Sequence, residues 1–286
     1  MSKAIKLVSP NFSDLLTPNI EIGKFPDGDS HVRIPQLAEC RGKEVIVFHR
    51  LYPKQNTALV ALLLILDSLK QEKAKVTVAA PYLPYARQDK KKLDGEVASA
   101  HTVCNLIARA GCKKFVTFDC HFLNQEGLTT FGELSIENIS MGHDLIEYAK
   151  TIFGDGPFEI IGPDAGANYL VEKRGGKAMK KVRKEYEDGR IDYRHIETLD
   201  GEFEVKGKNV LLLDDMISTG NTMIRALEKL AEAGAKRICC AAIHGLFLYN
   251  CLDKIRKFSE CIFATDTIEN SQAAVSIKDK LLALGA

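Results

Sequence analysis

Short apolar segments rich in β-branched and aromatic residues alternate with helical segments along most of this chain. The predicted strands cover residues 45–48, 76–80, 115–118, 158–161, 209–213, 237–243 and 261–264. The predicted helices cover residues 57–69, 97–110, 141–153 and 221–233. Strands that are apolar on both faces and alternate with helices form parallel sheets that helices cover on both sides. The alternation therefore predicts an α/β protein.

The length of 286 residues corresponds to about two domains. The strand and helix pattern restarts after the Gly-Asp-Gly-Pro break at residues 154–157. We expect an N-terminal domain over residues 1–141 and a C-terminal domain over residues 142–286. This division leaves room for about the last 15 residues to pack back on the N-terminal domain.

Charge and hydropathy exclude several classes of protein. The 39 Lys and Arg residues nearly balance the 38 Asp and Glu residues, which argues against a nucleic-acid partner. The longest apolar run, residues 58–66, is far shorter than the roughly 20 residues of a membrane helix. The N-terminus shows no signal-peptide pattern, and the eight cysteines include no Cys-x-x-Cys pair. We expect a cytoplasmic protein with no membrane partner, in which thiols such as Cys104, Cys239 and Cys261 act as small reduced hydrophobes.

The segment from Val210 to Thr222 contains the most specific pattern in the sequence. A buried strand leads into Asp214 and Asp215, which precede a short Ser/Thr/Gly loop and a helix. The loop amides, the helix N-terminus and the hydroxyl groups would hold a phosphate monoester, and the two acids would accept hydrogen bonds from ribose hydroxyls. The alternative is an ordinary turn in which Ser or Thr caps the helix, but a cap does not explain the two acids.

This segment resembles the phosphoribosyl-pyrophosphate-binding loop of type I phosphoribosyltransferases and ribose-phosphate pyrophosphokinases. Four further segments resemble motifs of the pyrophosphokinases in family order, namely residues 25–29, 82–89, 118–121 and 162–167. The whole chain thus resembles a ribose-phosphate pyrophosphokinase of the shorter archaeal-like type. The resemblance implies two similar phosphoribosyltransferase-like domains, each a mainly parallel sheet flanked by helices.

The resemblance also implies an ATP site, in which Phe25 is a platform for adenine and Arg87 binds triphosphate oxygens. The residues that it assigns to ATP are Phe25, Asp27, Gly28, Asp29, Arg87, Gln88 and Asp89. Considered alone, residues 25–29 are better explained as a plain turn, and residues 87–89 could be a solvated loop.

Magnesium is the implied cofactor, with His121 and Asp164 as its protein ligands beside the ATP phosphates. A single histidine is by itself more often structural. The family also has a mobile loop with a Lys-x-Arg pair, matched here by Lys181 and Arg183, which would stabilise charge in the transition state. Without the family, this charged segment is better explained as a solvated hairpin that turns at Asp188 and Gly189.

The implied ribose 5-phosphate site contains Arg183, Asp214, Asp215, Ser218, Thr219, Gly220, Asn221 and Thr222. Asn221 stands where many relatives have glycine, and asparagine tolerates left-handed backbone geometry. The implied reaction transfers the β,γ-diphosphoryl group of ATP to the 1-hydroxyl of ribose 5-phosphate, in a homo-oligomer. The alternatives are a phosphoribosyltransferase, which would share only the loop at residues 214–222, and a non-catalytic regulatory homologue.

Overall fold

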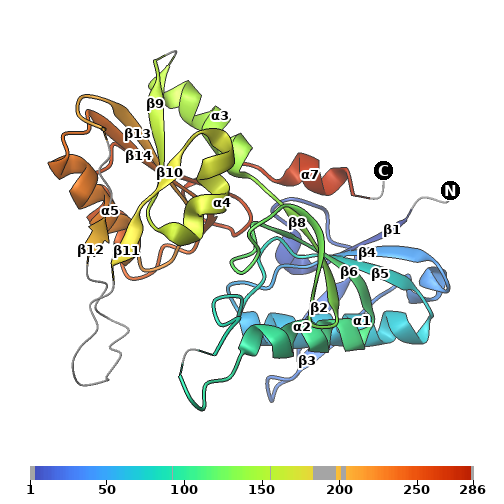
Figure 1. The fold of residues 1–286 in the computed structure, drawn as a ribbon. Coiled ribbons are helices and arrows are strands. Elements are labelled where there is room, and N and C mark those ends of the chain that lie inside the picture. Colours follow the sequence, from blue (N-terminus) through green and yellow to red (C-terminus); the bar gives the residue numbers. More distant parts are fainter. Residues whose placement is uncertain (1–3, 92, 155, 183–197, 201–203, 285–286) are drawn as a thin grey trace. The chain divides into compact units, whose positions relative to one another are not determined.

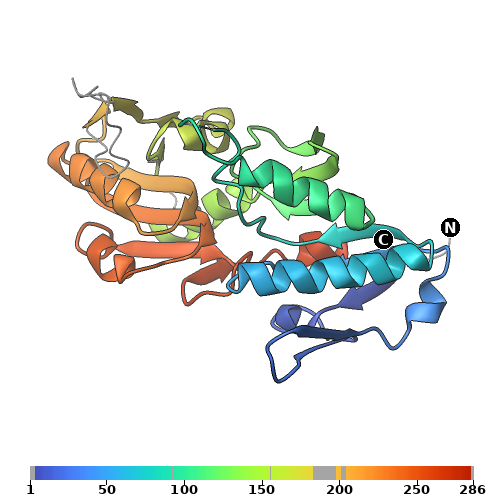
Figure 2. The same ribbon diagram turned by 90° about the horizontal axis from the view of Figure 1, so that it is seen from below.

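The computed structural model describes residues 4–91, 93–154, 156–182, 198–200 and 204–284. It divides into two compact units, which are Met1–Ile139 with Ser276–Ala286, and Ser140–Val275. We call them the N-terminal unit and the C-terminal unit. Each contains a six-stranded sheet (Figures 1 and 2).

The sheet of the N-terminal unit has the strand order β1-β4-β5-β6-β8-β7, in which only the edge strand β7 is antiparallel to its neighbour. Its strands are β1 Ile5–Val8, β4 Glu44–Phe48, β5 Lys75–Ala79, β6 Cys112–Phe118, β7 Gly127–Phe131 and β8 Leu134–Ile139. A separate hairpin consists of β2 Glu21–Lys24 and β3 Ser30–Arg33. The helices of this unit are α1 Gln55–Gln71, α2 Ser99–Ala110 and α7 Lys278–Leu282.

The apolar residues of α1 and α2 explain the core of this unit. Leu62, Ile65 and Leu66 of α1 pack in one cluster with Ile107 of α2 and with alternate residues of the sheet, such as Val76. Figure 1 shows α1 and α2 side by side along the sheet. Each of these side chains is fully buried, and this burial of apolar surface away from water holds α1 and α2 on the sheet.

The sheet of the C-terminal unit is parallel throughout, with the order β10-β9-β13-β14-β15-β16. Its strands are β9 Phe158–Gly162, β10 Lys177–Ala178, β13 Asn209–Ile217, β14 Arg237–Gly245, β15 Cys261–Thr265 and β16 Ala273–Val275. A short antiparallel pair consists of β11 Lys180–Val182 and β12 Thr198–Asp200. The helices are α3 Gly142–Phe153, α4 Asn168–Val171, α5 Asn221–Glu232 and α6 Cys251–Ile255.

Helices cover both faces of this second sheet. Met223 and Leu227 of α5 pack with Val210 and Leu212 of β13. Leu211 and Leu213 alternate with these residues and therefore point to the opposite face, on which α3 contacts β13 and β14. The α/β fold with two flanked, mainly parallel sheets is confirmed. Within the described ranges, no helix has the length and hydropathy needed to cross a membrane.

The structure differs from the predicted elements most clearly in β13. The strand expected at residues 209–213 continues to Ile217, so that Asp214 and Asp215 lie inside β13 instead of after it. The reason is pairing with β14, since Asp214 is in register with Ala242 and Met216 with His244. The prediction also lacked the β7–β8 hairpin.

Candidate functional site

The strand order of the C-terminal unit places one group of predicted residues at a switch point of the sheet. From β9 the chain goes to β10 on one side and to β13 on the other. Open α/β sheets bind ligands at the carboxyl ends of the strands where the order reverses in this way. Asp164 lies two residues after the end of β9, and Asp214 and Asp215 lie near the carboxyl end of β13.

These three carboxyl groups interact. Burial raises the pKa of Asp214 well above its ordinary value, and the charges of Asp215 and Asp164 raise it further. The amide of Asp215 donates a hydrogen bond of 2.9 Å to Asp214 Oδ1, and the amide of Gly166 donates one of 2.7 Å to Asp164 Oδ1. Asp215 is buried and the other two acids are half-buried, and carboxyl groups placed together in this way favour hydroxyl donors or a cation.

The loop of Ser218, Thr219 and Gly220 connects β13 to α5, as predicted. Gly220 is the N-cap of α5 and has a left-handed φ of 78°. Asn221 is the first residue of the helix, so the left-handed residue of this loop is Gly220 and not the asparagine. An ordinary Ser or Thr cap is also excluded, which leaves these hydroxyl groups for other partners. The first amides of α5 have no acceptor within the helix and present partial positive charge.

A second loop, residues 246–250, braces this first loop and was not predicted. The amides of Leu246 and Phe247 each donate a 3.0 Å hydrogen bond to the carbonyl of Ile217, and the amide of Leu248 donates one of 2.9 Å to Ser218. Phe247, Tyr249 and Asn250 have φ values of 47°, 56° and 55°. Left-handed residues other than glycine often mark functional segments. The sequence Leu-Phe-Leu-Tyr-Asn gave no local signal of this geometry.

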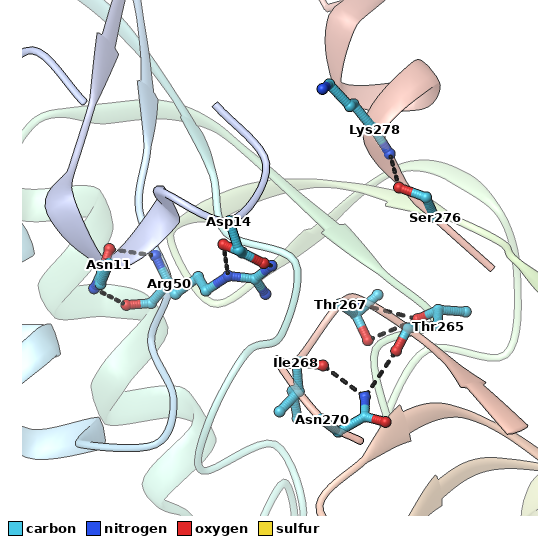
Figure 3. A network of polar contacts seen from close by, with 9 residues as sticks. All are labelled: Asn11, Asp14, Arg50, Thr265, Thr267, Ile268, Asn270, Ser276 and Lys278. Carbon is cyan, nitrogen blue, oxygen red and sulfur yellow. Dashed lines mark hydrogen bonds and ion pairs between the residues drawn. The ribbon is translucent and has the colours of Figure 1, made fainter. Parts of the chain in front are cut away.

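A network of buried hydroxyl groups ties β14 to β15 close to the same sheet edge. Thr267 Oγ1 lies 2.9 Å from His244 Nδ1 and donates to the carbonyl of Ile243 at 2.8 Å. Thr265 donates to the same carbonyl at 2.7 Å. Asn270 donates to the carbonyls of Thr265 and Ile268, as Figure 3 shows. This network fixes the end of β14, from which the bracing loop begins.

In the N-terminal unit, residues 25–29 form the turn of the β2–β3 hairpin. The amide of Phe25 donates a 2.9 Å hydrogen bond to the carbonyl of Asp29, and Asp27 Oδ1 accepts one of 3.1 Å from the amide of Asp29. Gly28 has a φ of 99°. The Phe25 ring is 52% exposed and meets the His31 ring edge-on at 5.2 Å. The segment is thus a turn that also presents an accessible aromatic face.

Residues 87–89 lie between β5 and α2. Arg87 is exposed, whereas Gln88 and Asp89 are half-buried. The carbonyl of Gln88 accepts a 3.2 Å hydrogen bond from the amide of Ala100, and the Ser99 hydroxyl donates to its side chain. The start of α2 therefore anchors this segment, and the guanidinium of Arg87 remains at the surface.

His121 is exposed beyond the carboxyl end of β6, in the N-terminal unit. Asp119, two residues earlier, is fully buried with a φ of 33°. The intervening amide of Cys120 donates a 2.9 Å hydrogen bond to Asn138 Oδ1 of β8. Lys181 lies in β11, in register with Leu199. Arg183, Asp188 and Gly189 lie outside the described residues.

No functional role was predicted for His49 and Arg50, which lie at the carboxyl end of β4. His49 Nδ1 lies 2.7 Å from Ser9 Oγ, and Nε2 lies 2.9 Å from the carbonyl of Ala58. Burial lowers the pKa of His49 to about 4, so the ring is neutral and donates to that carbonyl. Arg50 forms a 2.6 Å ion pair with Asp14, shown in Figure 3.

The donor set at the switch point suits magnesium. Within the described part of the chain, no three His, Cys, Asp or Glu side chains are grouped as a metal cage. Magnesium is commonly bound by one or two carboxylates together with substrate phosphates, so a cage is not required. A cation would offset both the burial of the Asp214 carboxyl group and its repulsion by Asp215 and Asp164, which raise its pKa.

Known proteins resemble the chain over both units. The family model for the N-terminal domain of ribose phosphate pyrophosphokinase matches residues 11–111, and that for the phosphoribosyl transferase domain matches residues 150–272. Ribose-phosphate pyrophosphokinases of Sulfurisphaera tokodaii and Pyrococcus abyssi are each 34% identical, covering 91% and 93% of this chain and 88% and 90% of theirs. The crystal structure of phosphoribosylpyrophosphate synthetase from Mycobacterium smegmatis has the same fold, with a TM-score of 0.80 at 24% identity, covering 98% of this chain and 96% of that one.

Proposed function

The chain belongs to the ribose-phosphate pyrophosphokinase family, and from this premise we propose how its residues divide the reaction. The enzyme transfers the β,γ-diphosphoryl group of ATP to the 1-hydroxyl of ribose 5-phosphate. The hydroxyl oxygen bonds to the β-phosphorus of ATP and loses its proton, and the bond to the α,β-bridging oxygen breaks. The products are phosphoribosyl pyrophosphate and AMP.

Ribose 5-phosphate is assigned to the C-terminal unit. Its phosphate would accept hydrogen bonds from the first amides of α5 and from the hydroxyls of Ser218, Thr219 and Thr222, with Gly220 and Asn221 completing the loop. Asp214 and Asp215 would accept hydrogen bonds from the ribose hydroxyls. The observation that carries this assignment is the acid pair beside a braced loop at the switch point of the sheet.

ATP is assigned to the N-terminal unit. Adenine would lie against the exposed ring of Phe25, with Asp27, Gly28 and Asp29 shaping that turn. Arg87 would bind phosphate oxygens, and Gln88 and Asp89 would line the same segment. Two observations support this role for Arg87. Its side chain is exposed, and the backbone of the neighbouring Gln88 is anchored to the start of α2.

His121 and Asp164 would hold magnesium, which when bound neutralises phosphate charge and orients the diphosphoryl group. Lys181 and Arg183 would contact the transferring group, where charge spreads as the bond to AMP breaks. By the same resemblance we propose a homo-oligomer that acts in the cytoplasm.

The test is phosphorus NMR of the protein with magnesium, ATP and ribose 5-phosphate. AMP and a sugar with a new diphosphate should appear together. ADP in place of AMP would exclude diphosphoryl transfer, and no turnover would favour a non-catalytic homologue. A phosphoribosyltransferase is disfavoured because it leaves the family match over residues 11–111 unexplained.

A further inference from the structure

Two cysteines of the C-terminal unit face each other across neighbouring strands. Cys239 of β14 is in register with Cys261 of β15, and the strands are parallel. Residues in register on neighbouring parallel strands point to the same face, with Cα atoms about 4.8 Å apart. This spacing lies within the range of about 4.4–6.8 Å that a disulfide spans. Both cysteines are free thiols here.

The two thiols differ in accessibility and in proton affinity. Cys239 is fully buried, whereas Cys261 is partly exposed. A hydrogen bond from the Cys239 thiol lowers the pKa of Cys261, and this effect outweighs burial and the charge of Glu260, which raise it. The same hydrogen bond, together with burial, raises the pKa of Cys239. Cys261 is therefore the nucleophile of the pair, and Cys239 holds the proton.

The charged neighbours of Cys261 are Arg237 and Glu260, at the start of the same two strands. Arg237 forms an ion pair of 2.7 Å with Glu260, and its guanidinium lies 5.4 Å from the centre of the Phe153 ring. The positive charge of Arg237 further lowers the pKa of Cys261. Thiolates beside a cation and open to solvent are the ones that react.

The other cysteines show what sets this pair apart. Burial raises the pKa of Cys104, Cys112 and Cys240 to about 12. Cys240 follows Cys239 directly but points to the opposite face, where it belongs to the core beneath α5. These thiols stay protonated and shielded.

We propose that Cys239 and Cys261 are a reversible oxidation site, at which hydrogen peroxide converts the two thiols to a disulfide between β14 and β15. The Cys261 thiolate attacks one peroxide oxygen, the O–O bond breaks, and the leaving hydroxide takes up a proton to become water. The product is a sulfenic acid at Cys261. Cys239 then loses its proton and attacks this sulfur, the S–O bond breaks, and a second water leaves. A small dithiol reverses the reaction.

The pair lies at the amino-terminal part of β14 and β15, whereas Asp214 and the loop at residues 218–220 lie at the carboxyl edge of the sheet. The inference therefore does not depend on the proposed function. It concerns chemistry at the opposite edge of the same sheet.

The direct test treats the native protein with a small excess of hydrogen peroxide, alkylates the remaining thiols and digests without reductant. We expect a cross-link between the tryptic peptides of residues 238–254 and 258–278, two hydrogens lighter than the separate peptides and broken by dithiothreitol. Fragmentation should assign it to Cys239. A bridge to Cys240 or Cys251, or Cys261 oxidised to a sulfinic acid while Cys239 is alkylated, would overturn the proposal.

Two variants sharpen the test. In Cys239→Ala, the oxidation of Cys261 should stop at the sulfenic acid, which dimedone traps. Alkylation of the Cys261 thiol should also be several-fold slower in this variant, because the hydrogen-bond donor is lost. Cys240→Ala is the matched control, since it changes the adjacent residue on the other face and should keep the cross-link. Equal alkylation rates of Cys261 in wild type and Cys239→Ala would show that the thiols do not interact. The wild-type digest decides the question even if a variant does not fold.

Discussion

At the scale of single residues, the carboxyl groups of Asp214 and Asp215 make the sharpest prediction. Replacing both by Asn should weaken ribose 5-phosphate binding by about 2 kcal/mol or more, because two charged hydrogen-bond acceptors are lost. ATP binding should be nearly unchanged, since ATP is assigned to the other unit. Titration calorimetry with each ligand measures both effects.

The same variant should be more stable than wild type without ligands, because it removes both the cost of burying the Asp214 carboxylate and its repulsion by Asp215 and Asp164, which together raise the pKa of Asp214. If calorimetry instead shows ATP lost and sugar phosphate retained, the two ligands have been assigned to the wrong units.

Lys181 distinguishes a catalytic loop from a solvated one. If it acts on the transferring group, Lys181→Ala should lower kcat by about 10²- to 10³-fold with little change in either KM. Lys177→Ala, which removes an exposed lysine of β10, serves as the control and should stay near wild type. A kcat within about threefold of wild type for Lys181→Ala would mean that the loop is merely solvated.

His49 should give the free energy of unfolding a pH dependence of its own. Its pKa is about 4 in the folded protein against 6.5 for an ordinary histidine, so the unfolded chain binds the proton first as the pH falls. The free energy of unfolding should therefore fall by about 3 kcal/mol between pH 6.5 and pH 4 through this group alone. Urea denaturation of wild type and His49→Gln at both pH values measures the loss.

The His49→Gln variant should be less stable than wild type at neutral pH, and its free energy of unfolding should depend less on pH. His143→Gln, at a histidine whose side chain is 72% exposed, should leave the wild-type slope unchanged. An equally steep slope in His49→Gln would assign the acid sensitivity to other groups.

At the scale of elements, the turn from β13 into α5 depends on Gly220. A Cβ atom there would lie 2.8 Å from Cys251 Cβ, in addition to the strain of a φ of 78°. Gly220→Ala should therefore displace the loop and weaken ribose 5-phosphate binding by about tenfold or more. Gly207→Ala is the matched control, because Gly207 has a φ of 72° with open space around it. It should cost about 1–2 kcal/mol of stability without changing affinity.

Regular elements could be predicted because their apolar periodicity is local. The segment predicted at residues 45–48 is β4, and the helix predicted at residues 57–69 is α1, two residues longer at each end. The β7–β8 hairpin had a usable signal in its two-residue Gly-Glu connection and the alternating burial of Leu134 and Ile136.

Features fixed by tertiary contacts could not be predicted in this way. The extension of β13 depends on pairing with β14, and the left-handed residues of the bracing loop depend on the carbonyls of Ile217 and Ser218. The sequence predicts only small reduced hydrophobes at Cys239 and Cys261, because it is the register of β14 and β15 that brings the two thiols together. The acids and the glycine loop could be singled out as candidates because they are contiguous in sequence.

At the scale of the whole molecule, the segment from Ser276 belongs to the N-terminal unit although it follows the entire C-terminal unit. Ile277 and Leu281 are fully buried, and Lys6 Nζ donates a 3.5 Å hydrogen bond to the carbonyl of Leu282. Leu281→Ala should cost about 3 kcal/mol and increase amide hydrogen exchange mainly in the N-terminal unit. Leu282→Ala, at a side chain that is 44% exposed, should change little. Increased exchange mainly in the C-terminal unit would contradict this division.

This arrangement of α7 also sets an order of events during translation. Residues 140–275 leave the ribosome as one continuous stretch that holds its entire sheet, so the C-terminal unit has all its strands before α7 is made. The N-terminal unit is synthesised first, yet it must wait through the synthesis of the whole second unit for its last helix. A nascent chain stalled before Ser276 would therefore expose the apolar surface that Ile277 and Leu281 cover in the folded protein. A chaperone that recognises exposed apolar surface would bind there.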